Sequence, residues 1–377
     1  MRPIRVLALS PMPEEGAGCR FRIAQFIPYL RSAGIDVTLR TLFDADFFHL
    51  VYKPGHYVRK ALGFAGLSLQ HLGSLRDTAR FDVILIYREM FPIGPAVVER
   101  LLARRRRPPV VFDFDDAIFL PSVSDANRFI RALKAPGKVA TIIRHSDHVI
   151  AGNEYLAGYA RRFTDAVTVI PTCVDTTRFV PSLDARSNNG PLREPIVGWI
   201  GSPTTSPYVR GLIEVFQRVR RRHPFRLRVS GAGERLDVPD VEIEQPSWAL
   251  DREVQLFNTC DVGVYPLVDD EWSKGKCGFK AIEFMACGVP VVAVAVGVNR
   301  QIIQDGVNGF LASTEDEWVE KIGRLLTSRE LRCRFGEAGR RTIETRYSLQ
   351  VHAPTLAATL RDVARGASSD GGHETWH

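Results

Sequence analysis

Short apolar runs alternate with helical patterns along almost the whole chain, and this alternation restricts the fold more than any other feature. The first run, Ile4–Ser10, is followed by a glycine-bearing loop, a helical pattern over residues 20–32 and a second run that begins at Ile35. Apolar runs without polar alternation are typical of parallel strands that helices cover on both faces. The chain therefore opens with a βαβ unit, and we expect an α/β fold.

The alternation continues in two series. The first series predicts strands at 83–87, 110–114, 148–152 and 167–171, and a helix at 95–105. The second predicts strands at 196–202, 227–233, 261–267 and 289–296, and helices at 208–222, 251–258 and 278–286. Between them, residues 181–195 are polar, carry Pro and Gly and lack an apolar period, as is typical of an interdomain linker.

We therefore predict two Rossmann-like domains with parallel sheets, residues 1–183 and 184–350, which face each other across a cleft. A chain of 377 residues is long enough for two such cores. Ligands of these sheets bind beyond the carboxyl ends of the strands. We further predict a C-terminal helix at 351–365 that packs back on the N-terminal domain, and a flexible tail at 366–377.

The composition indicates in which compartment the protein acts and which partners it can bind. We find no signal peptide, and the longest apolar stretch, residues 289–298, is shorter than the roughly 20 residues that a membrane span needs. The six cysteines form no C-x-x-C pair, which favours reduced thiols in the cytoplasm. A net charge of +7 favours an anionic partner, such as a nucleotide or a membrane surface. Because no nucleic-acid-binding motif is present, we do not expect nucleic acid.

The segment SKGKCGFKAIEFMACGVPVVA, residues 273–293, places lysines and glycines in front of an apolar helix and a buried strand. Helix N-terminal amides and glycines that allow close approach suit a phosphate, and lysines add charge. Glu283 lies about 7 Å along the helix, where a carboxylate can accept hydrogen bonds from a ribose diol. The alternative is an ordinary Lys280–Glu283 pair on a solvated face. We call the N-terminal end of this helix its mouth. The residues expected there are Lys276, Cys277, Gly278, Phe279 and Lys280.

The block from this segment through GVNRQIIQDGVNGFLAS resembles the donor-binding region of family-four retaining glycosyltransferases, the glycosyl transferases group 1, which have the GT-B fold. The segments IPTCVDTTRF, LRVSGAGE and DVGVYPL are also similar to that family, in the same order. The resemblance implies that Glu283 contacts the ribose and that backbone amides at Gly278 and Phe279 approach the sugar. The family's other donor-site Glu would fall on Gly275, so that acid is absent here.

The diphosphate site departs from the family pattern. The family's Arg and Lys after the first strand of the second domain fall on Ser202, beside Gly201, and near Pro207, and neither position is basic. A leaving diphosphate still needs positive charge. We expect Lys274, Lys276 and Lys280 to supply it, Lys280 in a catalytic role, with Arg210 as a weaker candidate and hydroxyl donors at Ser202 and Thr204. The alternative is that the three lysines only keep the loop soluble.

Carboxylates cluster where the strand VVFDF ends. Asp115 stands where many relatives carry a His, and Asp113 and Asp116 flank it. We consider three roles: a catalytic base or acceptor-orienting group at Asp115 and Asp116, a D-x-D metal site, and a helix cap. GT-B enzymes generally act without metal, so we expect no metal and no cofactor. Arg88 and Glu89, after another strand, are further acceptor-side candidates.

Two segments of the first domain remain. Gly16 and Gly18 lie where relatives let backbone amides approach the donor, whereas the simplest interpretation of Arg20 and Arg22 is surface charge. Residues 44–72 mix aromatic and basic side chains, so this segment either contacts an anionic membrane or forms a flap over the acceptor groove.

The sequence as a whole predicts a retaining, metal-independent glycosyltransferase that moves a sugar from a nucleoside diphosphate donor, UDP among the candidates, to a hydroxyl acceptor. That acceptor is a glycan, a small natural product or a lipid-linked molecule at the inner membrane face. Two alternatives are a nucleotide-sugar epimerase of the same architecture and a degenerate transferase retained as a partner subunit.

Overall fold

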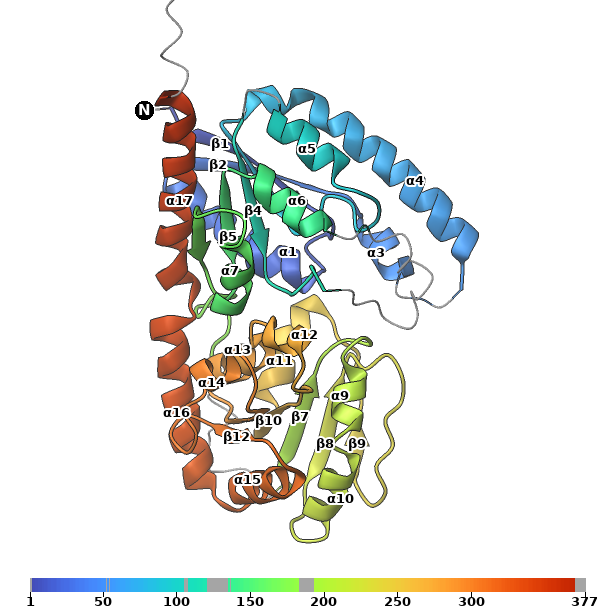
Figure 1. Cartoon of the computed structure of the whole chain (residues 1–377). Coiled ribbons are helices and arrows are strands. Elements are labelled where there is room, and N and C mark those ends of the chain that lie inside the picture. The colour runs from blue at the N-terminus through green and yellow to red at the C-terminus, as the bar shows by residue number, and fades with distance from the viewer. Residues whose placement is uncertain are drawn as a thin grey trace, which may run out of the picture. The chain divides into compact units, whose positions relative to one another are not determined.

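The computed structural model describes residues 2–51, 53, 55–104, 108–120, 135, 137–182 and 193–369. The chain divides into two compact units, Met1–Thr172 with His352–His377, and Cys173–Val351 (Figure 1). We call them unit 1 and unit 2. The division lies at 172/173 rather than at the predicted 183/184. Backbone hydrogen bonds explain this difference, because Val174 donates to Tyr347 and accepts from Leu349, which ties this stretch into unit 2.

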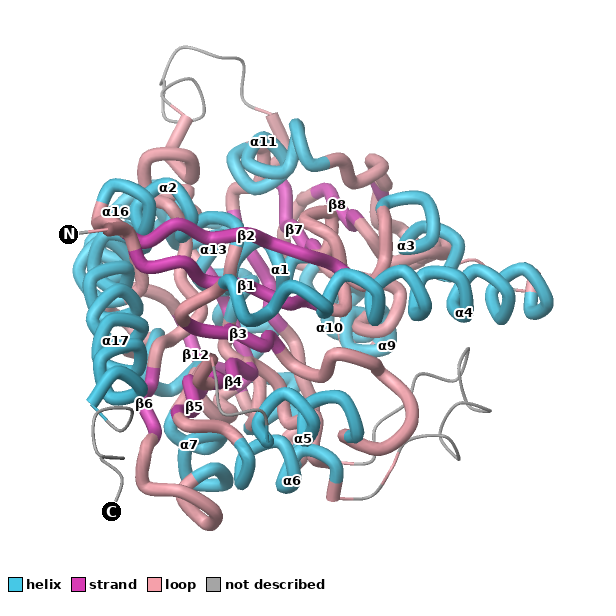
Figure 2. The backbone as a smooth tube through the Cα atoms, turned by 90° about the horizontal axis from the view of Figure 1, so that it is seen from above, coloured by secondary structure: helices cyan, strands magenta, loops and turns pink. Residues whose placement is uncertain are grey.

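Unit 1 contains a six-stranded sheet with the order β2-β1-β3-β4-β5-β6, whose neighbouring strands are all parallel. Figure 2 shows the first four strands in this order. The strands are β1 (Ile4–Ser10), β2 (Ile35–Thr41), β3 (Val83–Tyr87), β4 (Val110–Phe114), β5 (His148–Ala151) and β6 (Val167–Val169). All residues of β3 and β4 are buried, so both faces of the sheet contribute to the core.

The helices of unit 1 connect these strands. They are α1 (Ala17–Arg22), η1 (Ala24–Phe26), α2 (Ile27–Ser32), α3 (Ala45–Val51), α4 (Tyr57–Ser74), η2 (Leu75–Arg80), α5 (Val97–Arg104), α6 (Lys138–His145) and α7 (Glu154–Ala160). The single helix predicted over 20–32 is wrong. The backbone of Ile23 is not helical (φ −127°, ψ −65°), so the first helix ends before it. A separate helix, α2, begins at Ile27, and Pro28 lies in its first turn, where the missing N–H of proline is tolerated.

Unit 2 contains a second six-stranded parallel sheet, with the order β12-β11-β10-β7-β8-β9. Its strands are β7 (Ile196–Ile200), β8 (Arg226–Ser230), β9 (Ile243–Glu244), β10 (Val262–Tyr265), β11 (Val291–Val294) and β12 (Phe310–Ala312). Its helices are α9 (Ser206–Arg210), α10 (Ile213–Arg220), η4 (Leu250–Arg252), α11 (Glu253–Asn258), α12 (Glu271–Lys274), α13 (Phe279–Ala286), α14 (Asn299–Ile302), α15 (Glu315–Thr327) and α16 (Arg329–Arg346). Two parallel α/β halves, as predicted, are therefore confirmed.

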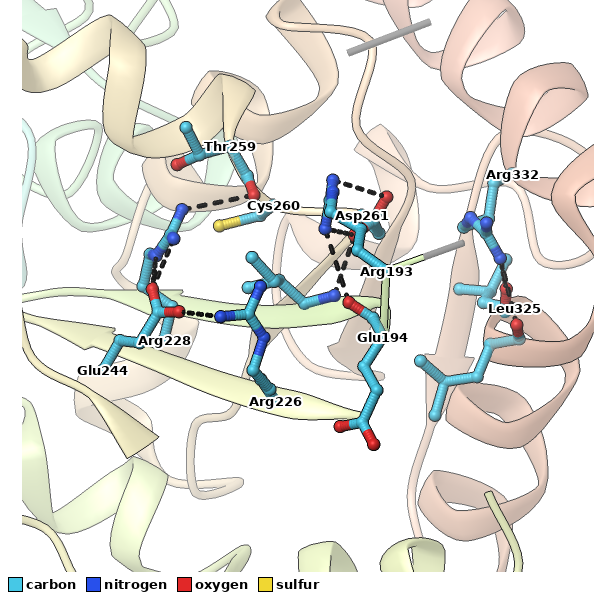
Figure 3. Close-up of polar contacts among 12 residues, drawn as sticks. Arg193, Glu194, Arg226, Arg228, Glu244, Thr259, Cys260, Asp261, Leu325 and Arg332 are labelled. Atoms are coloured by element: carbon cyan, nitrogen blue, oxygen red, sulfur yellow. Dashed lines mark hydrogen bonds and ion pairs between the residues drawn. The ribbon is translucent and has the colours of Figure 1, made fainter. Parts of the chain in front are cut away.

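The amino-terminal edge of the second sheet is held by ion pairs (Figure 3). Asp261 Oδ2 accepts hydrogen bonds from the backbone of Ile196 and from Arg193, both at 2.8 Å. On the edge strand β9, Glu244 accepts from Arg226 at 2.5 Å and from Arg228 Nε at 2.9 Å. These contacts explain why a two-residue strand that we did not predict pairs with β8.

The last helix, α17 (Leu349–Ser369), continues further than expected. Residues 366–369, predicted as part of the flexible tail, belong to this helix. Residues 370–377 and the centre of the predicted linker, 183–192, lie outside the described residues. Arg361 on α17 donates to the carbonyl of Ala33, so this part of the helix contacts the loop before β2.

Candidate functional site

In unit 2 the predicted donor residues lie in the loops at the carboxyl ends of the strands and in the first turns of α13. Gly201 and Ser202 follow β7, and Gly201 donates a backbone hydrogen bond to Ser230 at the end of β8. The segment after β10 carries α12 and then turns into α13. The fold therefore brings the Gly201 loop and the lysine-bearing segment to the same edge of the sheet, which is where ligands of parallel sheets bind.

Gly278 forms the mouth of α13. It has left-handed dihedrals (φ 65°, ψ 19°) and lies at the N-cap, as expected for a glycine that turns the chain into a helix. A Cβ here would come within 2.3 Å of Ile302 Cδ1 and 3.2 Å of Asn299 Oδ1. Both the dihedrals and the packing therefore require glycine, and they fix the direction in which the first amides of α13 point.

Glu283 and Lys280 form an ion pair inside unit 2. Lys280 Nζ donates to Glu283 Oε2 at 2.6 Å, and the Glu283 side chain is 0% exposed. The pair that we considered as an alternative thus exists, but it does not lie on a solvated face. Lys280 also lies against aromatic rings, 5.3 Å from the centroid of Phe279 and 5.5 Å from that of Phe257.

The other candidate cations lie near this pair in the chain. Lys276 Nζ lies 5.5 Å from the ring centroid of Trp272, and Lys274 donates to Glu271 at 2.6 Å. Cys277, the remaining residue of the helix mouth, is a buried thiol. Arg210 pairs with Glu234, so it is already engaged. Cation–aromatic contacts of this kind hold an ammonium group without neutralising it, which leaves its charge available to an anion.

The position of the family arginine is taken by hydroxyl groups. Ser202 Oγ lies 2.8 Å from Thr204 Oγ1 and 3.3 Å from Thr205 Oγ1, and the Ser202 amide donates to Thr205 Oγ1 at 3.0 Å. This cluster follows β7 directly. It can donate hydrogen bonds to a phosphate oxygen, but it cannot supply charge.

In unit 1 the loop after β1 approaches the end of β3. A Cβ on Gly18 would lie 2.1 Å from the Tyr87 hydroxyl oxygen, so only glycine allows this approach. At Gly16 a Cβ would lie 3.0 Å from Met12 Cβ and 3.5 Å from Phe48. Both predicted glycines therefore serve close packing, Gly16 at the end of the loop and Gly18 in the first turn of α1.

Arg88, which follows β3, forms hydrogen bonds with two carboxylates that follow β4, those of Asp115 and Asp116. Its Nε donates to Asp115 Oδ1 at 2.8 Å and its Nη2 to Asp116 Oδ2 at 2.5 Å, while the Tyr87 hydroxyl also donates to Asp115 Oδ1 at 2.8 Å. Arg88 has a left-handed φ of 58°, which is uncommon for a residue with a side chain. Such strain is held in place by surrounding contacts and concentrates at functional sites.

The charges around Asp115 lower its pKa. Burial acts to raise the pKa of Asp115, but the cations Arg88 and Arg22 and the Tyr87 hydrogen bond outweigh it and lower that pKa. An ionised carboxylate with a low pKa is a weak base at neutral pH but a good hydrogen-bond acceptor. The geometry thus favours orientation of an acceptor hydroxyl over proton abstraction. It also places the Arg88 guanidinium against both carboxylates.

Asp113 is held differently. Its carboxylate accepts from Arg22 Nε at 3.0 Å and from Arg22 Nη2 at 2.8 Å, and both side chains are almost fully buried. Arg22 Nη1 donates to the carbonyl of Ile170 at 2.6 Å. The interpretation of Arg20 and Arg22 as surface charge is therefore wrong, since both are buried. Asp113 lies behind the edge that Asp115 and Asp116 occupy, where it joins β4 to α1.

Glu89 belongs to a second buried group. Its carboxylate lies 3.7 Å from Lys138 Nζ, which donates to the carbonyl of Phe91. Glu99 Oε1 accepts from the backbone of Met90 at 3.1 Å, and burial raises the pKa of Glu99. Sequence reasoning missed Lys138, Tyr87 and Glu99. Tyr87 could have been found, because it is the last residue of a predicted strand, whereas nothing in the local pattern marks Lys138.

Two features are absent from the described residues. No group of three or more His, Cys, Asp or Glu side chains is placed to hold a metal ion within the residues that the structure describes. Of the helices described, none combines the length and apolar character that crossing a membrane requires.

Comparison with known proteins adds to this geometry. Residues 194–328 match the family model described as Glycosyl transferases group 1, and residues 18–178 match Glycosyltransferase Family 4. D-inositol 3-phosphate glycosyltransferase of Nocardia farcinica is 30% identical over an alignment of 401 positions, gaps included, and the alignment covers 89% of this chain and 84% of that protein. The enzyme of the same name from Segniliparus rotundus is 28% identical over 253 residues, which cover 60% of this chain and 55% of that protein.

Solved structures show the fold. Sucrose-phosphate synthase of Thermosynechococcus elongatus aligns with a TM-score of 0.72 at 18% identity, over 96% of this chain and 100% of that one. HepE of Anabaena, solved in complex with UDP and glucose, aligns with a TM-score of 0.67 at 18% identity, over 95% of this chain and 100% of that one. The predicted GT-B architecture of two Rossmann-like domains is confirmed.

Proposed function

Because the chain belongs to glycosyltransferase family 4, the glycosyl transferases group 1, we propose that it moves a sugar from a nucleoside diphosphate donor to an acceptor hydroxyl. The observation that carries the proposal is the mouth of α13. A left-handed glycine, a run of lysines and a buried carboxylate follow one another there at the carboxyl edge of a parallel sheet. HepE, which shares the fold, is described in complex with UDP and glucose.

The donor would bind with its diphosphate at this mouth. Lys276 supplies charge that the Ser202 hydroxyl cluster lacks, whereas Lys274 is paired with Glu271, and charge that develops on the leaving diphosphate is stabilised by cations already in place. Glu283 would accept the ribose hydroxyls. Since Lys280 holds Glu283, we expect donor binding to turn the Lys280 ammonium from the carboxylate toward the phosphates. In this way, binding of the ribose at Glu283 would bring the positive charge of Lys280 to the leaving diphosphate.

The acceptor would be oriented by unit 1. The carboxylates of Asp115 and Asp116, held by Arg88, present acceptor oxygens for a sugar or polyol hydroxyl. We propose that the reaction retains the anomeric configuration and needs no metal, with the donor diphosphate itself taking the acceptor proton. The curated relatives are inositol 3-phosphate glycosyltransferases, so an inositol phosphate is the first acceptor to test. Glycans, small natural products and lipid-linked alcohols follow.

The compartment proposed is the cytoplasm, where nucleotide sugars are made and thiols stay reduced. The six cysteines are free thiols, five of them buried. A peripheral association with the inner face of a membrane belongs to the same proposal, since a lipid-linked acceptor would require it.

The test is acceptor-dependent release of nucleoside diphosphate. The protein is incubated with UDP-, GDP-, ADP- and dTDP-sugars, with and without inositol phosphates or other acceptors, with excess EDTA as a parallel arm. We expect one donor to release nucleoside diphosphate only with acceptor, undiminished by EDTA, and NMR to show a retained anomeric centre. Conversion of the nucleotide-sugar without acceptor would favour the epimerase. Donor binding without turnover across the panel would favour a degenerate partner subunit.

A further inference from the structure

Helix α4 of unit 1 is apolar on its outer face as well as on its inner one. Its exposed large side chains are Tyr57 (68%), Val58 (74%), Leu62 (70%), Leu69 (72%) and Leu72 (41%). With 3.6 residues per turn, these five fall within an arc of about 140° on the helix. Ala61 and Ala65, also exposed, fall within the same arc. We call this arc the α4 outer face.

The opposite side of α4 accounts for its attachment to unit 1. Phe64 and Leu67 pack against the cluster that contains Phe43 and Phe47, and the ring centroids of Phe43 and Phe64 are 6.2 Å apart. A surface helix of a water-soluble protein needs only one such apolar stripe and is otherwise polar. The core therefore does not explain the outer face, and a contiguous exposed apolar patch is typical of an interaction surface.

The positive charges near the α4 outer face favour an anionic partner. No Asp or Glu occurs between residues 47 and 76, whereas Lys53, Arg59, Lys60 and Arg76 do. Arg59 and Lys53 are exposed, and Lys60 lies with its ammonium 6.0 Å from the Tyr57 ring centroid. A helix with apolar side chains flanked only by cations has the character of helices that lie in the interface of an anionic bilayer.

We propose that the α4 outer face docks unit 1 on an anionic lipid bilayer. Leu62, Leu69 and Val58 enter the boundary between headgroups and acyl chains, and Lys53 and Arg59 meet the lipid phosphates. The aromatic Tyr57 lies at the headgroup level, where its apolar ring and polar hydroxyl are both accommodated. Figures 1 and 2 both show the first turns of α4 projecting away from the sheet, so this end of the helix is open to a surface.

Docking would bring one edge of unit 1 to the membrane. Helix α3 follows the carboxyl end of β2, and α4 begins a few residues later, so the first turn of α4 lies toward that edge. Phe48 on α3 also lies near Gly16 in the loop after β1. The acceptor-side groups at the ends of β3 and β4 belong to the same edge. A lipid-linked acceptor follows from this arrangement only if the proposed transferase activity is correct, whereas docking itself does not depend on it.

The experiment is vesicle flotation of the full chain. Vesicles of phosphatidylcholine are compared with vesicles that also contain phosphatidylglycerol, at low and high salt. The test variant is Leu62→Glu with Leu69→Glu, which places two acids on the outer face. The matched control is Val268→Glu with Val307→Glu, two exposed valines of unit 2. Circular dichroism and thermal melting check that each variant keeps the fold, and the change of exposed residues makes loss of folding unexpected.

We expect the wild type to float with the anionic vesicles, and salt to weaken this binding. The test variant should bind at least about tenfold more weakly, because two large apolar groups no longer enter the bilayer, and the control should bind like the wild type. Failure of the wild type to bind anionic vesicles would overturn the proposal, as would equal loss in test and control variants. Concentration-dependent dimerisation that the test variant abolishes, without vesicle binding by the wild type, would instead assign the face to a second copy of the chain. Donor turnover, measured separately without lipid, shows whether the transferase proposal fails independently.

Discussion

The Lys280–Glu283 pair is the residue-scale feature on which the proposed donor binding depends. A carboxylate that is 0% exposed can receive a ribose only if neighbouring side chains move, and Lys280, paired with it at 2.6 Å, is one of them. Glu283→Gln keeps the shape of the side chain but removes its charge. We expect the dissociation constant of the preferred nucleoside diphosphate to rise about tenfold or more, since a hydrogen bond to a charged group contributes about 1.5–3 kcal/mol. Isothermal titration calorimetry measures it.

The chain offers a matched control for this change. Glu271 and Lys274 on α12 form a pair with the same sequence spacing and the same 2.6 Å distance, but both side chains are exposed. Glu271→Gln should leave the dissociation constant within about twofold, because exposed pairs of this kind contribute little. Equal effects of the two substitutions would remove Glu283 from the ribose site.

Asp115 gives a prediction about pH. Its folded-state pKa is lowered, so the carboxylate stabilises the fold above its unfolded value of 3.8 and loses this contribution as the pH falls through the lower folded value. Asp115→Asn should therefore lower stability at neutral pH, and the difference from the wild type should shrink as the pH falls below 3.8. Urea melts across this range measure the difference. A difference that grows toward acid pH would contradict the assignment.

Single residues also show where sequence reasoning stops. The place of Glu283 on a helix that follows Gly278 could be predicted, because it follows from helix geometry alone. Its full burial could not, because that depends on which elements cover α13. The Arg22–Asp113 pair joins residues that are 91 positions apart, and no local pattern connects them. An arginine at a helix start is ordinary surface charge unless tertiary packing buries it.

At the scale of elements, α13 packs closely against the sheet because a glycine of β10 leaves room for one of its side chains. A Cβ on Gly263 in β10 would lie 2.6 Å from the ring of Phe284, which packs edge-on against Phe257 with centroids 4.8 Å apart. Gly263→Ala should therefore push α13 away from β10 and lower the free energy of unfolding by about 1–3 kcal/mol, as overpacking does. Donor affinity should fall with it, because the α13 mouth shifts.

Gly158 in α7 is the control for this substitution. It is exposed, and a Cβ there would meet nothing within 4 Å. Gly158→Ala should raise the free energy of unfolding by about 0.5–1 kcal/mol, because alanine favours the helix. Chemical denaturation measures both variants. A Gly263→Ala protein as stable as the wild type would mean that α13 does not depend on this close contact.

The order of elements could be predicted, but their ends and breaks could not. Buried strands of four or more residues stand out by apolar content, so β1, β3, β4, β7, β10 and β11 were all expected. The two-residue β9 is too short to show a period and is fixed by Glu244. The three-residue β12 was not predicted, although β6, which is equally short, was. The predicted helix over 208–222 divides into α9 and α10 at Gly211 and Leu212, although its apolar period continues across the break.

At the scale of the whole molecule, each unit has its own sheet and its own core, so ligand binding can stabilise one unit selectively. Tryptophan provides a probe of this, because Trp199, Trp248, Trp272 and Trp318 all belong to unit 2. The fifth tryptophan, Trp376, lies outside the described residues. In a Trp376→Phe protein, intrinsic fluorescence therefore reports the unfolding of unit 2 alone, whereas far-UV circular dichroism reports both units.

We expect the preferred nucleoside diphosphate to raise the fluorescence midpoint in urea, because it binds folded unit 2 and not the unfolded chain. At a ligand concentration of about 100 times its dissociation constant, the gain is about 2.7 kcal/mol. The same ligand should give Glu283→Gln, in the Trp376→Phe background, a smaller gain at the same concentration. An unchanged fluorescence midpoint with UDP, GDP, ADP and dTDP, each at saturation by an independent binding assay, would place the nucleotide outside unit 2. The donor site proposed at the mouth of α13 would then be wrong, even if the chain transfers sugar.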